Sequence, residues 1–173
     1  MIEGERLKII PLTYPQLITY LKAKNKFEIE FGLAITGRLI SEDVKDMVES
    51  FTLPKMKKVD EDNYLYFTFW IVIDKSTNTI VAELGFKGPP DRNGDIEIGY
   101  GTMPDHRKKG YMTDAVSAMI EWASSREGVR CIIAEVEETN LASLRIVEKN
   151  GFKQFDKKGV MIWWRKTLNQ EIF

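Results

Sequence analysis

The sequence predicts a mixed α/β fold, on three observations. Stretches rich in β-branched and aromatic residues follow one another closely at 64–73, 79–87 and 95–103, which is typical of an antiparallel meander. A helical pattern at 110–125 and a short apolar strand at 131–136 come next. Strand, helix and strand in that order form a βαβ unit, so we expect the strands at 95–103 and 131–136 to be parallel.

The N-terminal third predicts one strand and two helices. Residues 6–12 alternate as a strand does. Thr13 opens a capping-box pattern that predicts a helix. Ser41 is a favourable N-cap for a second helix, which we expect Pro54 to end. Residues 25–38 between these helices have no clear period.

The C-terminal part predicts a helix and a closing hairpin. Residues 142–149 are helical in pattern and stop at Asn150-Gly151, which is typical of a helix C-terminus. Two strands at 152–156 and 160–168 flank a short turn and complete the sheet.

Composition excludes several function classes. Lys and Arg number 25 against 26 Asp and Glu, and a net charge of −1 argues against a nucleic-acid binder. A single Cys and a single His argue against a disulfide framework or a zinc site. Apolar runs fall well short of the ~20 residues that span a bilayer, and the N-terminus has no signal-peptide pattern. We therefore expect a cytoplasmic protein of one domain, 1–173, with no membrane or nucleic-acid partner.

Residues 105–114 carry the strongest chemical signal. They read Asp-His-Arg-Lys-Lys-Gly-Tyr-Met-Thr-Asp and lie between a predicted strand and a predicted helix. Helix N-termini have main-chain N–H groups without intrahelical partners, and Gly110 lets an anion approach them. Cationic side chains beside such donors favour a phosphate or pyrophosphate site, although neither a Walker loop nor a dinucleotide fingerprint is present. The alternative is a solvated basic loop.

Two motifs give this sequence a family resemblance. Arg-Lys-Lys-Gly-Tyr-Met at 107–112 resembles the pyrophosphate loop of the GCN5-related N-acetyltransferases (the GNAT superfamily), Arg/Gln-x-x-Gly-x-Gly/Ala, with Met112 in place of the small residue. Asn-Leu-Ala-Ser at 140–143 and Glu-Lys-Asn-Gly-Phe at 148–152 are similar to the signature of the RimJ/RimL-type branch of ribosomal-protein acetyltransferases. Residues 5–12 also resemble the first strand of that branch.

The resemblance implies the GNAT fold, in which a mixed central sheet is flanked by helices and two parallel strands splay apart. It implies acetyl-CoA as co-substrate and no metal, with the pantetheine arm in the gap like an added strand. It assigns contacts with this co-substrate to Gly101, Thr102 and Met103 on the strand, to Arg107, Lys108, Lys109, Gly110, Tyr111, Met112 and Thr113 at the pyrophosphate, and to Asn140 and Ser143 near the thioester.

Catalytic residues follow from the same resemblance. An amine must lose a proton before it attacks, so a carboxylate base is needed. The resemblance places this base on the fourth strand, which makes Glu97 the first choice, with Glu83 second and Glu135 third. A strand-edge ion pair is the alternative role for Glu97. Many members use a Tyr to protonate the leaving thiolate, but Val147 stands at that position, so Ser143 is the candidate, its alternative being a binding or capping role.

The resemblance implies an N-acetyltransferase that acetylates a primary amine of a protein N-terminus, a peptide or a small molecule by direct attack on the thioester. The alternative is a catalytically silent acyl-CoA-binding module or sensor, which Val147 favours. The sequence leaves the oligomeric state open, between a monomer and the homodimer that is frequent in this branch. Because side chains alternate along a strand, one of Trp163 and Trp164 is expected to face the acceptor groove.

Overall fold

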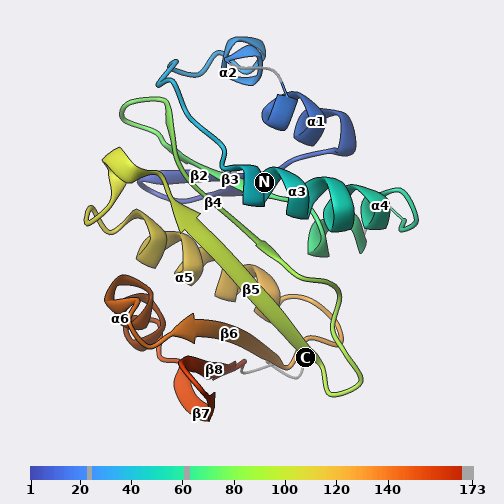
Figure 1. The fold of residues 1–173 in the computed structure, drawn as a ribbon, viewed down its shortest axis with the longest axis vertical. Coiled ribbons are helices and arrows are strands. Elements are labelled where there is room, and N and C mark those ends of the chain that lie inside the picture. Colours follow the sequence, from blue (N-terminus) through green and yellow to red (C-terminus); the bar gives the residue numbers. More distant parts are fainter. Residues whose placement is uncertain (23–24, 61–62, 169–173) are drawn as a thin grey trace.

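The strands form one twisted mixed sheet in a computed structural model that describes residues 1–22, 25–60 and 63–168 (Figure 1). Only β5 and β6 pair in parallel, and the other neighbours pair antiparallel. In sheet order the strands are β1 (Ile2–Glu3), β2 (Leu7–Pro11), β3 (Trp70–Asp74), β4 (Thr79–Phe86), β5 (Asp95–Thr102), β6 (Cys131–Glu137), β8 (Met161–Thr167) and β7 (Lys153–Lys158).

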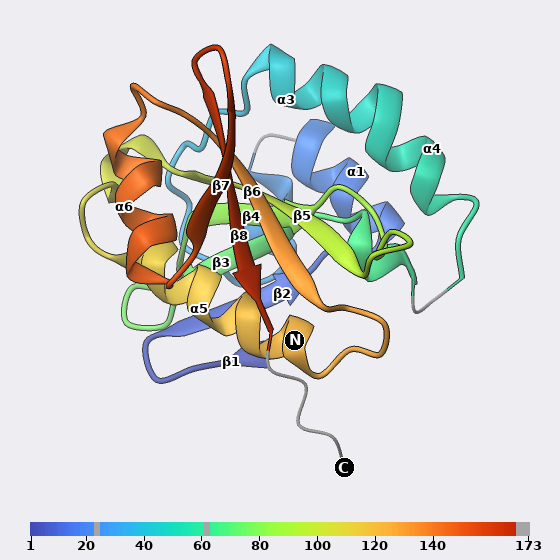
Figure 2. The same ribbon diagram turned by 90° about the horizontal axis from the view of Figure 1, so that it is seen from below.

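Helices cover both faces of this sheet (Figures 1 and 2). One face, called here the α5 face, carries α5 (Tyr111–Ser124) and α6 (Leu141–Lys149). The opposite face, called the α3 face, carries α1 (Tyr14–Lys22), α2 (Lys26–Glu30), α3 (Glu42–Met47), the π-helical turn η1 (Val48–Thr52) and α4 (Leu53–Met56). Two short 3-10 turns, η2 (Asn63–Tyr66) and η3 (Pro104–His106), lie in connections.

Strand β3 explains why the middle of the sequence is so apolar. Trp70 and Val72 belong to the core of the α5 face, whereas Ile71 and Ile73 belong to the core of the α3 face. A strand that is buried on both sides needs apolar residues at every position, so no polar alternation is seen.

The two parallel strands separate along their length, as predicted. Pairing joins Asp95 to Cys131 and ends at Glu97 and Ile133. β5 then continues to Thr102 and β6 to Glu137, and the two strands diverge (Figure 1). The sheet therefore has a wedge-shaped gap at its centre, whose edges carry main-chain groups that no longer pair with each other.

Most predicted elements are confirmed close to their predicted bounds, including both N-terminal cap positions. Thr13 N–H donates to Gln16 Oε1 at 2.8 Å, and Ser41 Oγ accepts from Val44 N–H at 3.3 Å. The short N-terminal hairpin of β1 and β2 was not predicted, because two residues are too few to show a period.

The strand predicted at 64–73 is wrong over its first half. Residues 63–66 form η2, and the strand begins at Trp70. The indole Nε1–H of Trp70 donates to Leu65 O at 3.0 Å, and the Thr68 hydroxyl donates to Leu12 O at 2.5 Å. These contacts hold an aromatic-rich turn against the sheet, which composition alone does not separate from a strand.

The prediction that Pro54 ends its helix is also wrong. Pro54 lies in the first turn of α4, and the chain stays helical from Glu42 to Met56. The preceding turn, η1, is π-helical, and this wider turn accommodates a proline ring and a missing N–H better than an α-helical turn does.

Candidate active site

The loop before α5 has the geometry of an anion site. Lys108 and Gly110 both have positive φ, 62° and 82°, and Gly110 is the N-cap of α5. The first N–H groups of α5 have no intrahelical partner, and the helix dipole adds partial positive charge there. Arg107, Lys108 and Lys109 are exposed around these donors, while Met112 is 3% exposed and packs into the core. The Met112 side chain therefore does not obstruct the loop.

Arg6 and Asp74 hold this loop against the sheet. The Arg6 guanidinium donates to Lys109 O at 2.7 Å, pairs with Asp114 at 3.1 Å and stacks on the Tyr111 ring. The Tyr111 hydroxyl donates to Asp74 Oδ2 at 2.7 Å. This bond is the largest of the effects that lower the pKa of Asp74 to about 2. The start of α5 is thus fixed by Arg6, just before β2, and by Asp74 at the end of β3.

Hydrogen bonds along β5 show which main-chain groups face the gap. Lys87 N–H donates to Glu97 O at 2.9 Å, and Met103 N–H donates to Val81 O at 2.9 Å. Odd-numbered residues of this strand therefore turn their main-chain groups toward β4. Because main-chain groups alternate along a strand, the residues that turn theirs toward the gap are Ile98, Tyr100 and Thr102.

This alternation separates the three strand residues that the resemblance assigned to the co-substrate. Thr102 directs its main chain into the gap. Gly101 and Met103 direct theirs toward β4, where the Met103 N–H is already used. Main-chain contacts to a molecule in the gap are therefore expected from Thr102 and, two residues earlier, from Tyr100.

Helix α6 packs on the α5 face, against β6 and α5. The Asn140 side chain caps it by accepting from Ser143 N–H at 3.1 Å. Asn140 is exposed and Ser143 half-buried, while Val147 is fully buried and offers no polar group. Within the described residues, Asn140 therefore has a structural role that is independent of any ligand.

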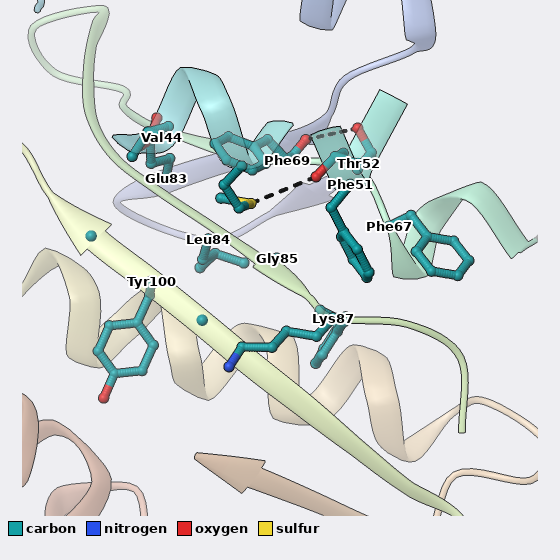
Figure 3. A pocket seen from close by; sticks show the side chains of 15 residues that line it. Val44, Phe51, Thr52, Phe67, Phe69, Glu83, Leu84, Gly85, Lys87 and Tyr100 are labelled. Atoms are coloured by element: carbon teal, nitrogen blue, oxygen red, sulfur yellow. Dashed lines mark hydrogen bonds between the residues drawn. The ribbon is translucent and has the colours of Figure 1, made fainter. Parts of the chain in front are cut away.

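Tyr100 is a polar residue at this site that the sequence did not single out. Its hydroxyl is buried and has no hydrogen-bond partner among the described residues. Burial raises the pKa of Tyr100, and the neighbouring Ser143 hydroxyl partly offsets this rise, although no hydrogen bond of normal geometry joins them. In Figure 3 the ring points away from Phe51, toward the α5 face. The sequence did contain a signal for this orientation, because side chains alternate along a strand and Tyr100 therefore lies on the same side as Ile96 and Ile98.

A cavity of about 490 Å³ lies against the α3 face over β4 and β5 (Figure 3). Its lining is largely apolar and comes from α3, η1 and the segment before β3. Strands β4 and β5 form its floor. The residues are Val44, Met47, Phe51, Thr52, Phe67, Thr68, Phe69, Glu83, Leu84, Gly85, Phe86, Lys87, Gly99, Tyr100 and Gly101.

Glu83 is the carboxylate inside this cavity. It lies opposite Gly101 in the sheet, and its Oε2 accepts from the Tyr20 hydroxyl at 2.7 Å. Burial raises the pKa of Glu83, and the Tyr20 bond and the Arg38 charge only partly offset this rise. Tyr20 was not predicted to contribute, because α1 is remote in sequence from β4.

Glu97 and Glu135 lie on the same face but in a different setting. The Lys87 ammonium forms an ion pair with Glu97 and lies 3.8 Å from Glu135. Both carboxylates are about one-third exposed. Glu97 thus has the ion pair that was its alternative role.

The two tryptophans divide between the faces as alternation requires. Trp164 is 8% exposed and belongs to the core of the α5 face. Trp163 pairs with Glu135 and so lies on the α3 face, beyond the residues that line the cavity.

The described residues contain neither a metal-binding cluster nor a membrane-spanning helix. They hold no group of three or more His, Cys, Asp or Glu that could bind a metal ion. Likewise, none of the helices in the described ranges is long and apolar enough to cross a bilayer.

Comparisons with known proteins agree with this geometry. The family described as "Acetyltransferase (GNAT) domain" matches residues 6–153. The uncharacterized N-acetyltransferase YjdG of Bacillus subtilis (strain 168) is 35% identical over 152 residues, which are 88% of this chain and 89% of that protein. Among solved structures, the ribosomal L7/L12 alpha-N-protein acetyltransferase RimL in complex with coenzyme A has a TM-score of 0.67 at 14% identity, covering 97% of each chain. The microcin C7 self immunity acetyltransferase MccE, in complex with acetyl-CoA and AMP, has a TM-score of 0.62 at 14% identity, covering 95% of this chain and 94% of that one.

A splayed sheet with an anion loop at the mouth of the gap defines an acyl-transfer enzyme of the N-acetyltransferase class. The chain belongs to the GNAT acetyltransferase family, which confirms the family and the fold predicted from the two motifs.

Proposed function

We propose that the protein transfers an acetyl group from acetyl-CoA to a primary amine, which belongs to a protein N-terminus, a peptide or a small molecule. The observation that carries this proposal is the gap between β5 and β6, with the anion loop on one side and a carboxylate-bearing cavity on the other. A thioester held in the gap would be reached from the cavity by the amine.

Binding of acetyl-CoA would rest mainly on main-chain groups. The N–H groups of residues 110–113 would bind the pyrophosphate, with Arg107, Lys108 and Lys109 adding charge. Tyr100 and Thr102 would pair with the pantetheine amides as a neighbouring strand does. A gap-facing N–H of β5 would also stabilise the oxyanion that forms on the acetyl oxygen.

Glu83, rather than Glu97, is the base that we propose. It lies inside the cavity, whereas Glu97 is held by Lys87. A carboxylate with a raised pKa is a better proton acceptor at neutral pH than an ordinary one. Glu83 would take a proton from the ammonium, directly or through a water, and the free amine would then attack the thioester carbon.

Collapse of the tetrahedral intermediate breaks the carbon–sulfur bond and releases a thiolate that needs a proton. Ser143 remains our candidate donor, and Tyr100 joins it. The buried Tyr100 hydroxyl faces the side of the sheet where the loop and α6 lie, which is the side from which the thioester would enter. The proton would pass from Tyr100 or Ser143 to the sulfur, with Val147 taking no part.

The test is release of CoA thiol from acetyl-CoA, followed with a thiol reagent in the presence of a panel of primary amines. Amine-dependent release, with matching acetylated product by mass spectrometry, is expected. CoA binding without any amine-dependent release would instead support the silent acyl-CoA-binding module. A cytoplasmic location and the extent of the domain over 1–173 stay predictions from the sequence, and the choice between a monomer and a homodimer stays open.

A further inference from the structure

We propose that the cavity on the α3 face selects amines that carry a bulky apolar group and no carboxylate beside the amine. This inference rests on the proposed function, because it names the class of acceptor for the same site. Three features of the cavity carry it, and each concerns a different part of its wall.

The roof of the cavity consists of apolar side chains, two of which are exposed to solvent. Val44 and Phe51 project from α3 and η1 over the sheet, and Phe67 and Phe69 line the cavity from the segment before β3 (Figure 3). Met47 of α3 also lines the cavity. Met47 and Phe51 are 43% and 42% exposed, which is high for large apolar side chains. Apolar groups of this size gain most from contact with an apolar ligand, at ~25 cal/mol for each Å² removed from water.

The floor is a strip of three glycines, Gly85, Gly99 and Gly101. Gly85 is needed for packing, because a Cβ there would lie 2.7 Å from Thr68 O. A Cβ at Gly99 or Gly101 would meet nothing within 4 Å, and neither residue has a positive φ. Neither packing nor backbone strain requires glycine at these two positions. What their missing side chains do provide is room over the strand for a ligand.

The charges in the cavity favour an ammonium and disfavour a carboxylate. Glu83 is a carboxylate with one hydrogen bond among the described residues, to Tyr20. Lys87 is the one cation among the lining residues that the structure describes, and it is already paired with Glu97 and lies beside Glu135. Arg38, behind Tyr20, is paired with Glu28 in a buried ion pair. An acceptor carboxylate would therefore be desolvated without a cation to receive it.

Phenylalaninamide, phenylalanine, alaninamide and putrescine separate these features as acceptors. We expect kcat/KM for phenylalaninamide to exceed that for each of the other three by at least about tenfold. Phenylalanine tests the carboxylate, alaninamide tests the apolar group, and putrescine tests charge alone. Equal use of alaninamide or phenylalanine would overturn the inference.

A second experiment changes the volume of the cavity by substitution. Gly99→Leu places a side chain in the open space and is expected to lower kcat/KM for phenylalaninamide at least tenfold, and for alaninamide by less. Met47→Ala removes apolar contact from the roof of the cavity and should also lower kcat/KM for phenylalaninamide. Leu39→Ala is the matched control, because Leu39 is 84% exposed and lies outside the lining. An equal loss for both amides in Gly99→Leu would contradict selection by the cavity.

A binding measurement keeps this inference separate from the proposed function. The CoA complex of the wild-type protein is titrated with phenylalaninamide and with alaninamide by calorimetry. Tighter binding of phenylalaninamide without any thiol release would refute the proposed acetyltransferase activity and support the proposed selectivity of the cavity. Thiol release with no preference for phenylalaninamide would refute the proposed selectivity of the cavity and support the proposed acetyltransferase activity.

Discussion

On the α5 face main-chain donors of a single loop form the candidate site, whereas on the α3 face the candidate site is formed by side chains from segments that are far apart in the sequence. The anion loop and the helix that it starts lie within residues 104–124. The cavity takes Glu83 from β4, Phe67 and Phe69 from the segment before β3, and its roof from α3 and η1. Tyr20 of α1 lies outside the lining and donates a hydrogen bond to Glu83. Under the proposed function, binding of the co-substrate therefore depends mainly on local sequence, whereas recognition of the acceptor depends on tertiary contacts.

Substitutions of Glu83 and Glu97 have the largest expected effects and test whether the base lies in the cavity of the α3 face. Glu83→Gln is expected to lower kcat by about 10²- to 10⁴-fold, the usual contribution of a general base, because the amide cannot accept the proton. Glu97→Gln, on the same face, is expected to change kcat only slightly, since its main contact is Lys87. Steady-state kinetics with a fixed amine measures both. A larger loss for Glu97→Gln would return the role of base to the residue that the sequence favoured.

The pH dependence of kcat/KM tests the same residue by its protonation. Burial raises the pKa of Glu83, so the carboxylate becomes protonated, and the base is lost, as pH falls through a value above the ordinary carboxylate range. The wild-type rate is expected to fall on this acid limb. In Glu83→Gln the limb is expected to disappear, while the limb due to the acceptor amine remains. An unchanged acid limb in the variant would assign it to another group.

Tyr100 tests whether the α5 face contributes side-chain chemistry as well as main-chain binding. Tyr100→Phe is expected to lower kcat about tenfold, with KM for acetyl-CoA nearly unchanged. This loss is below the usual ~10²- to 10⁴-fold contribution of a proton donor, because Ser143 remains as a second donor. Ser143→Ala should have a smaller effect, and the double variant should be the slowest. Tyr66→Phe serves as the control, because Tyr66 is buried in the same core and does not line the cavity. If both tyrosine variants were equally slow, the loss would reflect packing.

Asp74→Asn addresses the support of the anion loop and has the smallest expected effect. Asp74 accepts from the Tyr111 and Ser76 hydroxyls, and such charged hydrogen bonds contribute about 2 kcal/mol. Its pKa is lowered to about 2, so its contribution to stability is complete above the ordinary Asp range and is lost as pH falls through that value. Thermal unfolding should show a lower Tm for the variant at pH 7 and a smaller difference near pH 2. A constant difference over this range would contradict the account.

The sequence predicted the α5 face well because its geometry is local. A glycine at a helix start, flanked by cations after a strand, identifies the loop, although Arg6 and the Tyr111–Asp74 hydrogen bond also hold it in place. Asn150-Gly151 marks the C-terminal end of α6 in the same local way. Splaying of β5 and β6 came from the family resemblance and could not be derived from the residues, since it depends on where pairing stops.

The α3 face was predicted less well for physical reasons. Burial decides between Glu83 and Glu97, and burial depends on Tyr20 and on the roof helix, which sequence spacing does not connect to β4. The continuation of the roof past Pro54 depends on a π-helical turn that has no sequence signature. The long stretch 25–38 has no period because its geometry comes from single contacts, such as the buried pair of Arg38 with Glu28.

Calorimetric titration of CoA into the wild type, Gly110→Asp and Gly159→Asp tests the central claim most directly. Gly110 and Gly159 both have positive φ, at 82° and 60°, so the two variants carry similar backbone strain, but only Gly110 lies at the anion loop. We predict tight binding to the wild type and to Gly159→Asp, and little or no binding to a folded Gly110→Asp. Equal affinity of the two variants would contradict a co-substrate held by the main chain at the start of α5.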